Sequence, residues 1–154
     1  MKKSIIIILI YLFTLSNCGY KISNLQKNYN IIEIETSGNN NINYKIKNKL
    51  LSNNQSESIN LIKLNIVTKK SKSIKEKNIS NEITKYEIIL TSKINYKSVE
   101  NNANGNFVVT KTGNYAVMKK YSDTLNNEKN LIKTLTNEIS EEIEEILKAD
   151  LNDT

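Results

Sequence analysis

The sequence predicts an α+β fold, in which two helices pack on one face of a small, mostly antiparallel sheet of four strands in the order β-α-β-β-β-α. Two observations predict it. Apolar and polar residues alternate through the middle of the chain, and segments with helical spacing lie on either side of that block. The 154-residue chain is also long enough for one modest core, so we expect no second domain.

The first strand and the first helix are expected close together. Residues 29–35 are rich in isoleucine and predict a strand. Ser37 can cap the helix that follows, which we expect over residues 40–51. Its apolar side chains recur at a spacing of four and form a narrow stripe that should lie on the sheet: Ile42, Ile46 and Leu50.

Three further strands are expected next. Residues 58–68 predict the second strand, with Ile62, Leu64 and Ile66 on one face. Residues 82–99 carry the longest alternating pattern. Its apolar members are Tyr86, Ile88, Leu90, Ile94 and Tyr96. A turn at residues 101–105 leads into a returning strand from Phe107 to Met118, so these two strands should form a hairpin.

The last element is a long amphipathic helix over residues 124–151, with Asp123 and Thr124 available as caps. Its apolar residues follow spacings of three, four and seven: Leu125, Ile132, Leu135, Ile139, Ile143, Ile146 and Leu147. A cluster of glutamates lies in the same region, from Glu138 to Glu145. Helical periodicity makes a solvated helix face the favoured interpretation of that cluster, ahead of a paired-carboxylate site.

The N-terminus has the pattern of a lipoprotein leader. Lys2 and Lys3 precede a nearly unbroken apolar segment at residues 5–13, which is too short to span a bilayer. The only cysteine, Cys18, follows this segment directly, where a lipobox places the residue that receives a diacylglycerol. We therefore expect a signal peptide at residues 1–17 and a single lipidated domain at 18–154. The alternative is an ordinary secretory signal, since Asn17 departs from the small residue usual before the cysteine.

Composition restricts the function. The net charge is +6 and every basic residue is lysine, in a chain whose lysine, asparagine and isoleucine bias is typical of an AT-rich genome. The chain lacks histidine and tryptophan, has one cysteine and has no glycine-rich phosphate loop. We therefore expect no enzymatic activity, no catalytic residues, no cofactor, no metal ion and no nucleic-acid partner.

The mature sequence resembles the LPS-assembly lipoproteins of the Gram-negative outer membrane (LptE). The likeness rests on Cys18-Gly19-Tyr20 at the mature start, on the strand and helix that end at Leu51, and on the central hairpin. It also includes the segment from Tyr121 to Leu131, where an aromatic residue and a short loop precede an acidic start to the last helix.

This resemblance implies a role without catalysis. Members of the family sit as a plug inside the LptD β-barrel, help it to fold, and contact lipopolysaccharide. The expected partners are thus an LptD-like barrel, lipopolysaccharide and, through the N-terminal lipid, the outer membrane. Gly19 after the cysteine favours sorting to that membrane. The candidate lipopolysaccharide-binding residues are Lys69, Lys70 and Lys72, expected on a loop between the second and third strands.

Other interpretations stay open. The lysine run can equally be a solvated loop in a lysine-biased chain. A different class of protein also starts at a lipidated cysteine and has a small α/β domain, namely the accessory lipoprotein of a phospholipid-transport ABC system. A structural envelope lipoprotein that tethers another component is a third possibility.

Overall fold

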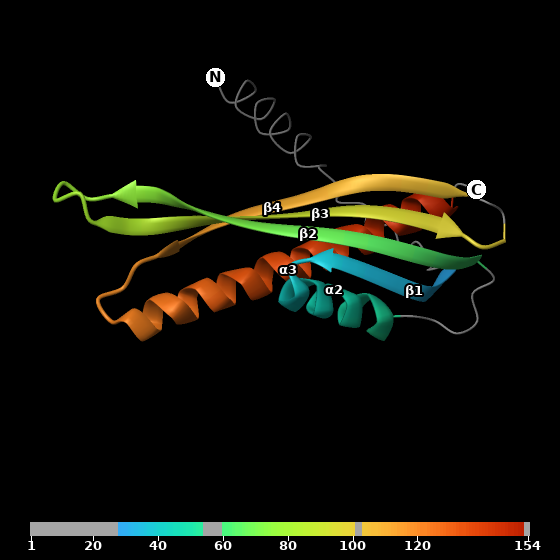
Figure 1. The fold of residues 1–154 in the computed structure, drawn as a ribbon, viewed down its shortest axis with the longest axis horizontal. Helices are drawn as coiled ribbons and strands as arrows, with labels where there is room; N and C mark the ends of the chain where they lie inside the picture. Colours follow the sequence, from blue (N-terminus) through green and yellow to red (C-terminus); the bar gives the residue numbers. More distant parts are fainter. Residues whose placement is uncertain (1–27, 54–59, 101–102, 153–154) are drawn as a thin grey trace, which may run out of the picture.

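The computed structural model describes residues 28–53, 60–100 and 103–152 (Figure 1). Its elements are β1 (Tyr29–Gly38), α2 (Asn40–Ser52), β2 (Asn60–Lys77), β3 (Ile83–Ser98), β4 (Asn104–Ala116) and α3 (Tyr121–Asn152). The strands form one sheet in the order β1-β2-β3-β4. The predicted fold class is confirmed. The sheet is mixed, because β1 pairs parallel to β2 while the other two pairings are antiparallel.

Both helices cover the same face of the sheet, as Figure 1 shows, and the other face carries no helix. The long helix α3 packs mainly on β4, and the short helix α2 lies between α3 and β1. We call the uncovered side of the sheet the open face. The alternating pattern of each strand follows from this arrangement, since every second side chain points to the helices and the others point to solvent.

The core lies between the sheet and the two helices and contains the side chains that the periodicity predicted. The apolar stripe of α2 is buried, as are Ile62, Leu64 and Ile66 of β2. In β3, Ile88, Leu90 and Ile94 have no exposed surface, and Tyr96 is also buried. In α3, the buried apolar residues are Leu135, Ile139, Ile143, Leu147 and Leu151. Leu125, expected on the same stripe, is instead exposed near the start of the helix.

The helix starts differ from the expected caps. Asn39 is the N-cap of α2, and its side-chain oxygen accepts a hydrogen bond from the N–H of Ile42 at 3.2 Å. Ser37 lies within β1, so its predicted capping role is wrong. Helix α3 begins at Tyr121, ahead of the two expected caps. The hydroxyl of Thr124 accepts the N–H of Met118 at 2.8 Å and so fixes the loop that leads into the helix.

The largest correction concerns β2, which continues to Lys77 rather than ending at residue 68. Beyond Gly38 and Thr68, β1 no longer accompanies it, and residues 69–77 pair only with β3. This part of β2 and the start of β3 form a long hairpin arm at the end of the sheet (Figure 1). The lysines expected on a loop therefore lie on a strand. Cross-strand bonds to β3 form this strand, although its own side chains are exposed.

Among the described residues, no helix has the length and apolar character needed to cross a membrane. The signal peptide expected at 1–17 and the lipidation site Cys18 lie outside the described residues.

Candidate functional site

The lysine run is divided between the two faces of the sheet, because successive residues of a strand point in opposite directions. Lys70 and Lys72 point to the helix side, where both meet Glu128 of α3. The ammonium of Lys72 lies 2.7 Å from Glu128 Oε2, and that of Lys70 lies 3.6 Å from Oε1. These two lysines thus join the exposed part of β2 to the first turns of α3.

Two stacked tyrosines complete this cluster. The rings of Tyr86 and Tyr115 lie 5.6 Å apart, and the Lys72 ammonium is 4.3 Å from the first ring centre and 5.3 Å from the second. Tyr115 also donates its hydroxyl hydrogen to Glu128 at 2.7 Å. A cation over an aromatic face gains about 0.5–2 kcal/mol, depending on its solvation. We call Lys70, Lys72, Tyr86, Tyr115 and Glu128 the β2–α3 latch.

The charges of the latch stabilise one another. Burial alone would raise the pKa of Glu128, but hydrogen bonds from Lys72 and Tyr115 and the nearby charge of Lys70 lower it below its ordinary value. Burial alone would lower the pKa of Lys72, yet its contacts with Glu128 and Tyr115 raise it well above the usual value. The Glu128 carboxylate and the Lys72 ammonium are therefore both held in their charged forms, and they already neutralise each other.

Lys69 is different, because it lies on the open face. It is exposed and has no ion-pair partner among the described residues. Lys93 of β3 lies on the same face diagonally across from it, since Lys69 pairs with Thr91 two residues earlier in β3. Lys93 is likewise exposed and without an ion pair in the described part of the chain. Two exposed lysines without an ion pair in the described structure are thus diagonal neighbours on the open face.

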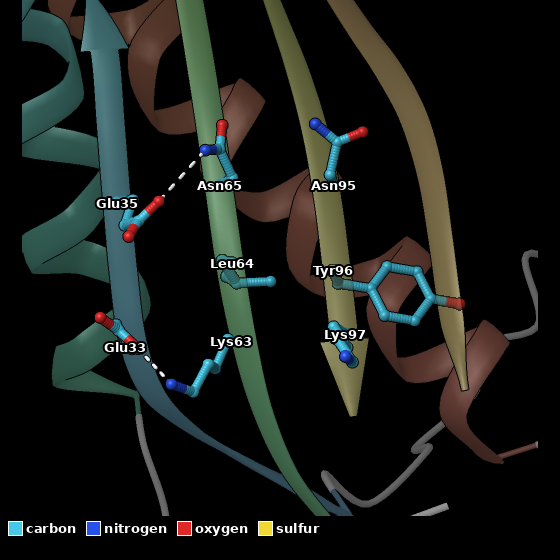
Figure 2. A pocket seen from close by; sticks show the side chains of 8 residues that line it. All are labelled: Glu33, Glu35, Lys63, Leu64, Asn65, Asn95, Tyr96 and Lys97. Carbon is cyan, nitrogen blue, oxygen red and sulfur yellow. Dashed lines mark hydrogen bonds and ion pairs between the residues drawn. The ribbon is translucent and has the colours of Figure 1, made fainter. Parts of the chain in front are cut away.

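A shallow pocket of about 350 Å³ lies on the same face, over the wider end of the sheet. Figure 2 shows its polar side chains, which come from three neighbouring strands. They are Glu33, Glu35, Lys63, Asn65, Asn95 and Lys97. Because all six are exposed, the pocket can bind polar groups through amides, carboxylates and ammonium groups.

The strand register explains how the pocket is arranged. Lys63 of β2 has Glu33 on one side and Lys97 of β3 on the other. Glu33 pairs with Lys63 at 2.6 Å, which lowers the pKa of the carboxyl and raises that of the ammonium. Lys97 has no ion pair among the described residues. In the next row, Glu35 accepts a long hydrogen bond of 3.4 Å from Asn65, which lies opposite Asn95.

The sequence interpretation missed both the pocket and the latch. The alternation along each strand places the lysines and asparagines of the pocket opposite the buried residues, but it does not show that they converge. Their convergence depends on the register between β1, β2 and β3, which local spacing does not contain. Among the residues that the structure describes, no group of three or more histidine, cysteine or acidic side chains could hold a metal ion.

Three solved structures show how this fold compares with known proteins. The rare lipoprotein B from Shewanella oneidensis matches with a TM-score of 0.59 and 11% identity, over 78% of this chain and 97% of that one. Lipoprotein B from Nitrosomonas europaea matches with a TM-score of 0.56 and 13% identity, over 87% and 93%. A minor lipoprotein from Acinetobacter baumannii matches with a TM-score of 0.51 and 12% identity, over 79% and 94%.

At these identities the likeness shows the fold alone. The chain has an α+β fold that several solved lipoproteins share over nearly their whole length. No protein-family model and no curated protein sequence matches it.

Proposed function

We propose that the protein is a lipid-anchored lipoprotein of the outer membrane that plugs an LptD-like β-barrel, supports its assembly and helps to insert lipopolysaccharide. It acts without catalysis. The observation that carries the proposal is the open face, a sheet surface with exposed polar side chains that no helix covers, on a fold that solved lipoproteins share. The lipobox at Cys18 and the resemblance to LptE support it further.

The open face is suited to a water-lined barrel lumen. Along β4 it carries short uncharged side chains, and Lys63 on β2 is neutralised by Glu33. Along β4, where the open face carries no charge, the sheet can pack against a polar wall without burying an unpaired charge. The exposed ammonium groups of Lys69 and Lys93 are left to contact the phosphates or carboxylates of a passing glycolipid.

The placement of the lysines changes the ranking of the proposed contact residues. Lys69, Lys70 and Lys72 all remain candidates, but the latter two are paired with Glu128 and must give up that contact to bind a ligand. Lys69 has no ion pair in the described structure and can bind a ligand without breaking one. We therefore infer that Lys69, with Lys93 beside it, makes the main contact with the anionic head group.

Co-purification tests the plug role. The full chain is expressed with the LptD-like barrel of the same genome and purified from detergent-solubilised membranes. Asn95→Trp places a bulky ring on the open face, and Asn48→Trp makes the same change on the exposed side of α2. We expect Asn95→Trp to reduce recovery of the barrel more than Asn48→Trp does. Recovery of an inner-membrane ABC permease in place of a barrel would support the phospholipid-transport alternative.

A titration with lipopolysaccharide tests the lysine contact. The double variant with Lys69→Glu and Lys93→Glu should bind markedly less at low ionic strength, and the difference should shrink at high salt. The double variant with Lys45→Glu and Lys133→Glu reverses two exposed charges on the helices and serves as the matched control. Equal weakening by the control would show that net charge, rather than this pair of lysines, controls binding.

Lipidation needs its own measurement. Cys18→Ser should leave an unprocessed or soluble precursor, whereas the wild-type protein should partition into detergent and carry acyl mass on its N-terminal peptide. Density-gradient fractionation should place it with the outer membrane. A wild-type protein found in the aqueous phase would contradict the anchor.

A further inference from the structure

Strand β4 forms one edge of the sheet, and two hydrogen bonds define which of its backbone groups face outward. At one end Ser98 N–H donates to the carbonyl of Ala103, and at the other Val117 N–H donates to that of Thr84. The β3–β4 register has no shift between them. In an antiparallel pair the residues alternate between facing the neighbour and facing away. The even-numbered residues of β4 therefore direct their N–H and C=O groups outward.

These outward groups form a free edge over residues 106–114. None of them has a hydrogen-bond partner among the residues that the structure describes. The side chains of the same residues lie exposed on the open face and carry no charge: Asn106, Val108, Thr110, Thr112 and Asn114. The edge contains no proline and no register shift. The one lysine of β4, Lys111, lies on the helix side and pairs with Glu142.

The free edge of β2 is protected by comparison. Residues 69–77 carry five lysines and two register shifts, and both features hinder the approach of another strand. Natural proteins commonly guard exposed edges in this way. Residues 69–77 of β2 are thus a guarded edge, whereas β4 carries neither of these protective features.

A second copy of the chain fits this edge poorly. Helix α3 lies over β4, where Leu131 and Leu135 pack close above Gly113. Two copies joined through their β4 edges would bring their α3 helices against each other, and packed helices need about 8–10 Å between their axes, more than the roughly 5 Å between adjacent strands. A single extended strand has no helix above it and meets no such obstacle.

The charge beside the edge indicates the chemistry of that strand. On the helix side, Glu138, Glu142 and Glu145 are spaced by four and three residues and share one face of α3, and Glu142 pairs with Lys111 of β4. One ammonium cannot neutralise three carboxylates. Alternate side chains of an added strand would lie beside this acidic flank, and the others would continue the uncharged open face. Basic residues are favoured at the first set of positions and small uncharged residues at the second.

We propose that the β4 edge binds an extended segment of another polypeptide by strand addition, and that this segment alternates basic with small uncharged side chains. The backbone groups of residues 106–114 supply the hydrogen bonds, and the acidic flank of α3 selects the basic residues. This proposal goes beyond the plug function and does not depend on it.

The test uses the detergent-solubilised full chain and a fluorescent peptide of alternating threonine and lysine, about nine residues long to match the free edge. A second peptide carries glutamate in place of lysine, and a third has N-methyl groups on alternate amides. Thr112→Pro removes an outward N–H of β4 without breaking a bond to β3. Ile74→Pro is the matched control, because its N–H faces the free edge of β2.

We expect the lysine peptide to bind the wild type and Ile74→Pro equally, and Thr112→Pro about tenfold or more weakly, a difference of about 1.4 kcal/mol. The glutamate and N-methylated peptides should bind the wild type weakly. N-methylation tests strand pairing even if Thr112→Pro unfolds. Unchanged binding by Thr112→Pro or by the N-methylated peptide would overturn the proposal, as would a wild-type dimer that Thr112→Pro dissociates. Equal binding of the glutamate peptide would overturn the charge preference.

Discussion

The two halves of β2 are stabilised in different ways. Over residues 60–68 the strand has β1 on one side and β3 on the other, and its inward side chains are buried beneath the helices. Over residues 69–77 only β3 accompanies it, and every side chain is exposed. The first half is held by apolar burial. The second half depends on its hydrogen bonds to β3 and on the β2–α3 latch. Different interactions therefore stabilise the two halves of one continuous strand.

The largest effect should come from truncating a buried side chain in the first half. Ile66 has no exposed surface, so Ile66→Ala should lower the free energy of unfolding by about 2–5 kcal/mol. Ile74 is 50% exposed in the second half, and Ile74→Ala should change it by no more than about 0.5 kcal/mol. Denaturant titration measures both. Similar losses would mean that the two halves are buried to a similar degree.

Breaking the latch should have an intermediate effect. Glu128→Gln leaves Lys70, Lys72 and Tyr115 without their shared carboxylate, so we expect a loss of about 1 kcal/mol, reduced by the partial exposure of the lysines. Glu141→Gln removes a more exposed partner, which is paired with Lys49 on α2, and serves as the control. A loss for Glu128→Gln no larger than for the control would show that the latch adds nothing to stability.

The latch should also make stability depend on acid pH. The pKa of Glu128 is lower in the folded protein than its ordinary value of 4.5. A lowered folded pKa gives stability that is fully present above the unfolded pKa and is lost as the pH falls through the folded one. The stability difference between wild type and Glu128→Gln should therefore be constant above about pH 5 and shrink below about pH 4. A difference that grows on acidification would contradict the assigned charge states.

The smallest effect on stability is expected at Lys69, which is not part of the β2–α3 latch. Lys69→Glu changes an exposed side chain without an ion pair in the described structure, so the free energy of unfolding should move by no more than about 0.5 kcal/mol. Lys72→Glu should cost more, because it places a second carboxylate beside Glu128. Thermal unfolding of the two variants side by side makes the comparison. Equal losses of stability in the two variants would show that side chains on both faces of this strand contribute equally to the stability of the fold.

The sequence determined the parts of the fold that depend on burial. Alternation predicted the strands, spacing of three and four predicted both helices, and most of the predicted apolar residues lie in the core. These patterns are informative because one side of each helix or strand faces the core. Apolar residues therefore recur with the same repeat as the backbone, about 3.6 residues in a helix and two in a strand. The open face could also be predicted, as the polar side of the same strands.

Only the tertiary structure decided how these elements meet. The second half of β2 buries nothing, so its residues carry no alternation, and its strand form comes from the register with β3. The latch joins Lys72 to Glu128 across 56 positions of the sequence, and the pocket joins Glu33 to Lys63 through the parallel pairing of β1 and β2. Such contacts depend on register and packing between distant segments, which the local pattern of side chains does not specify.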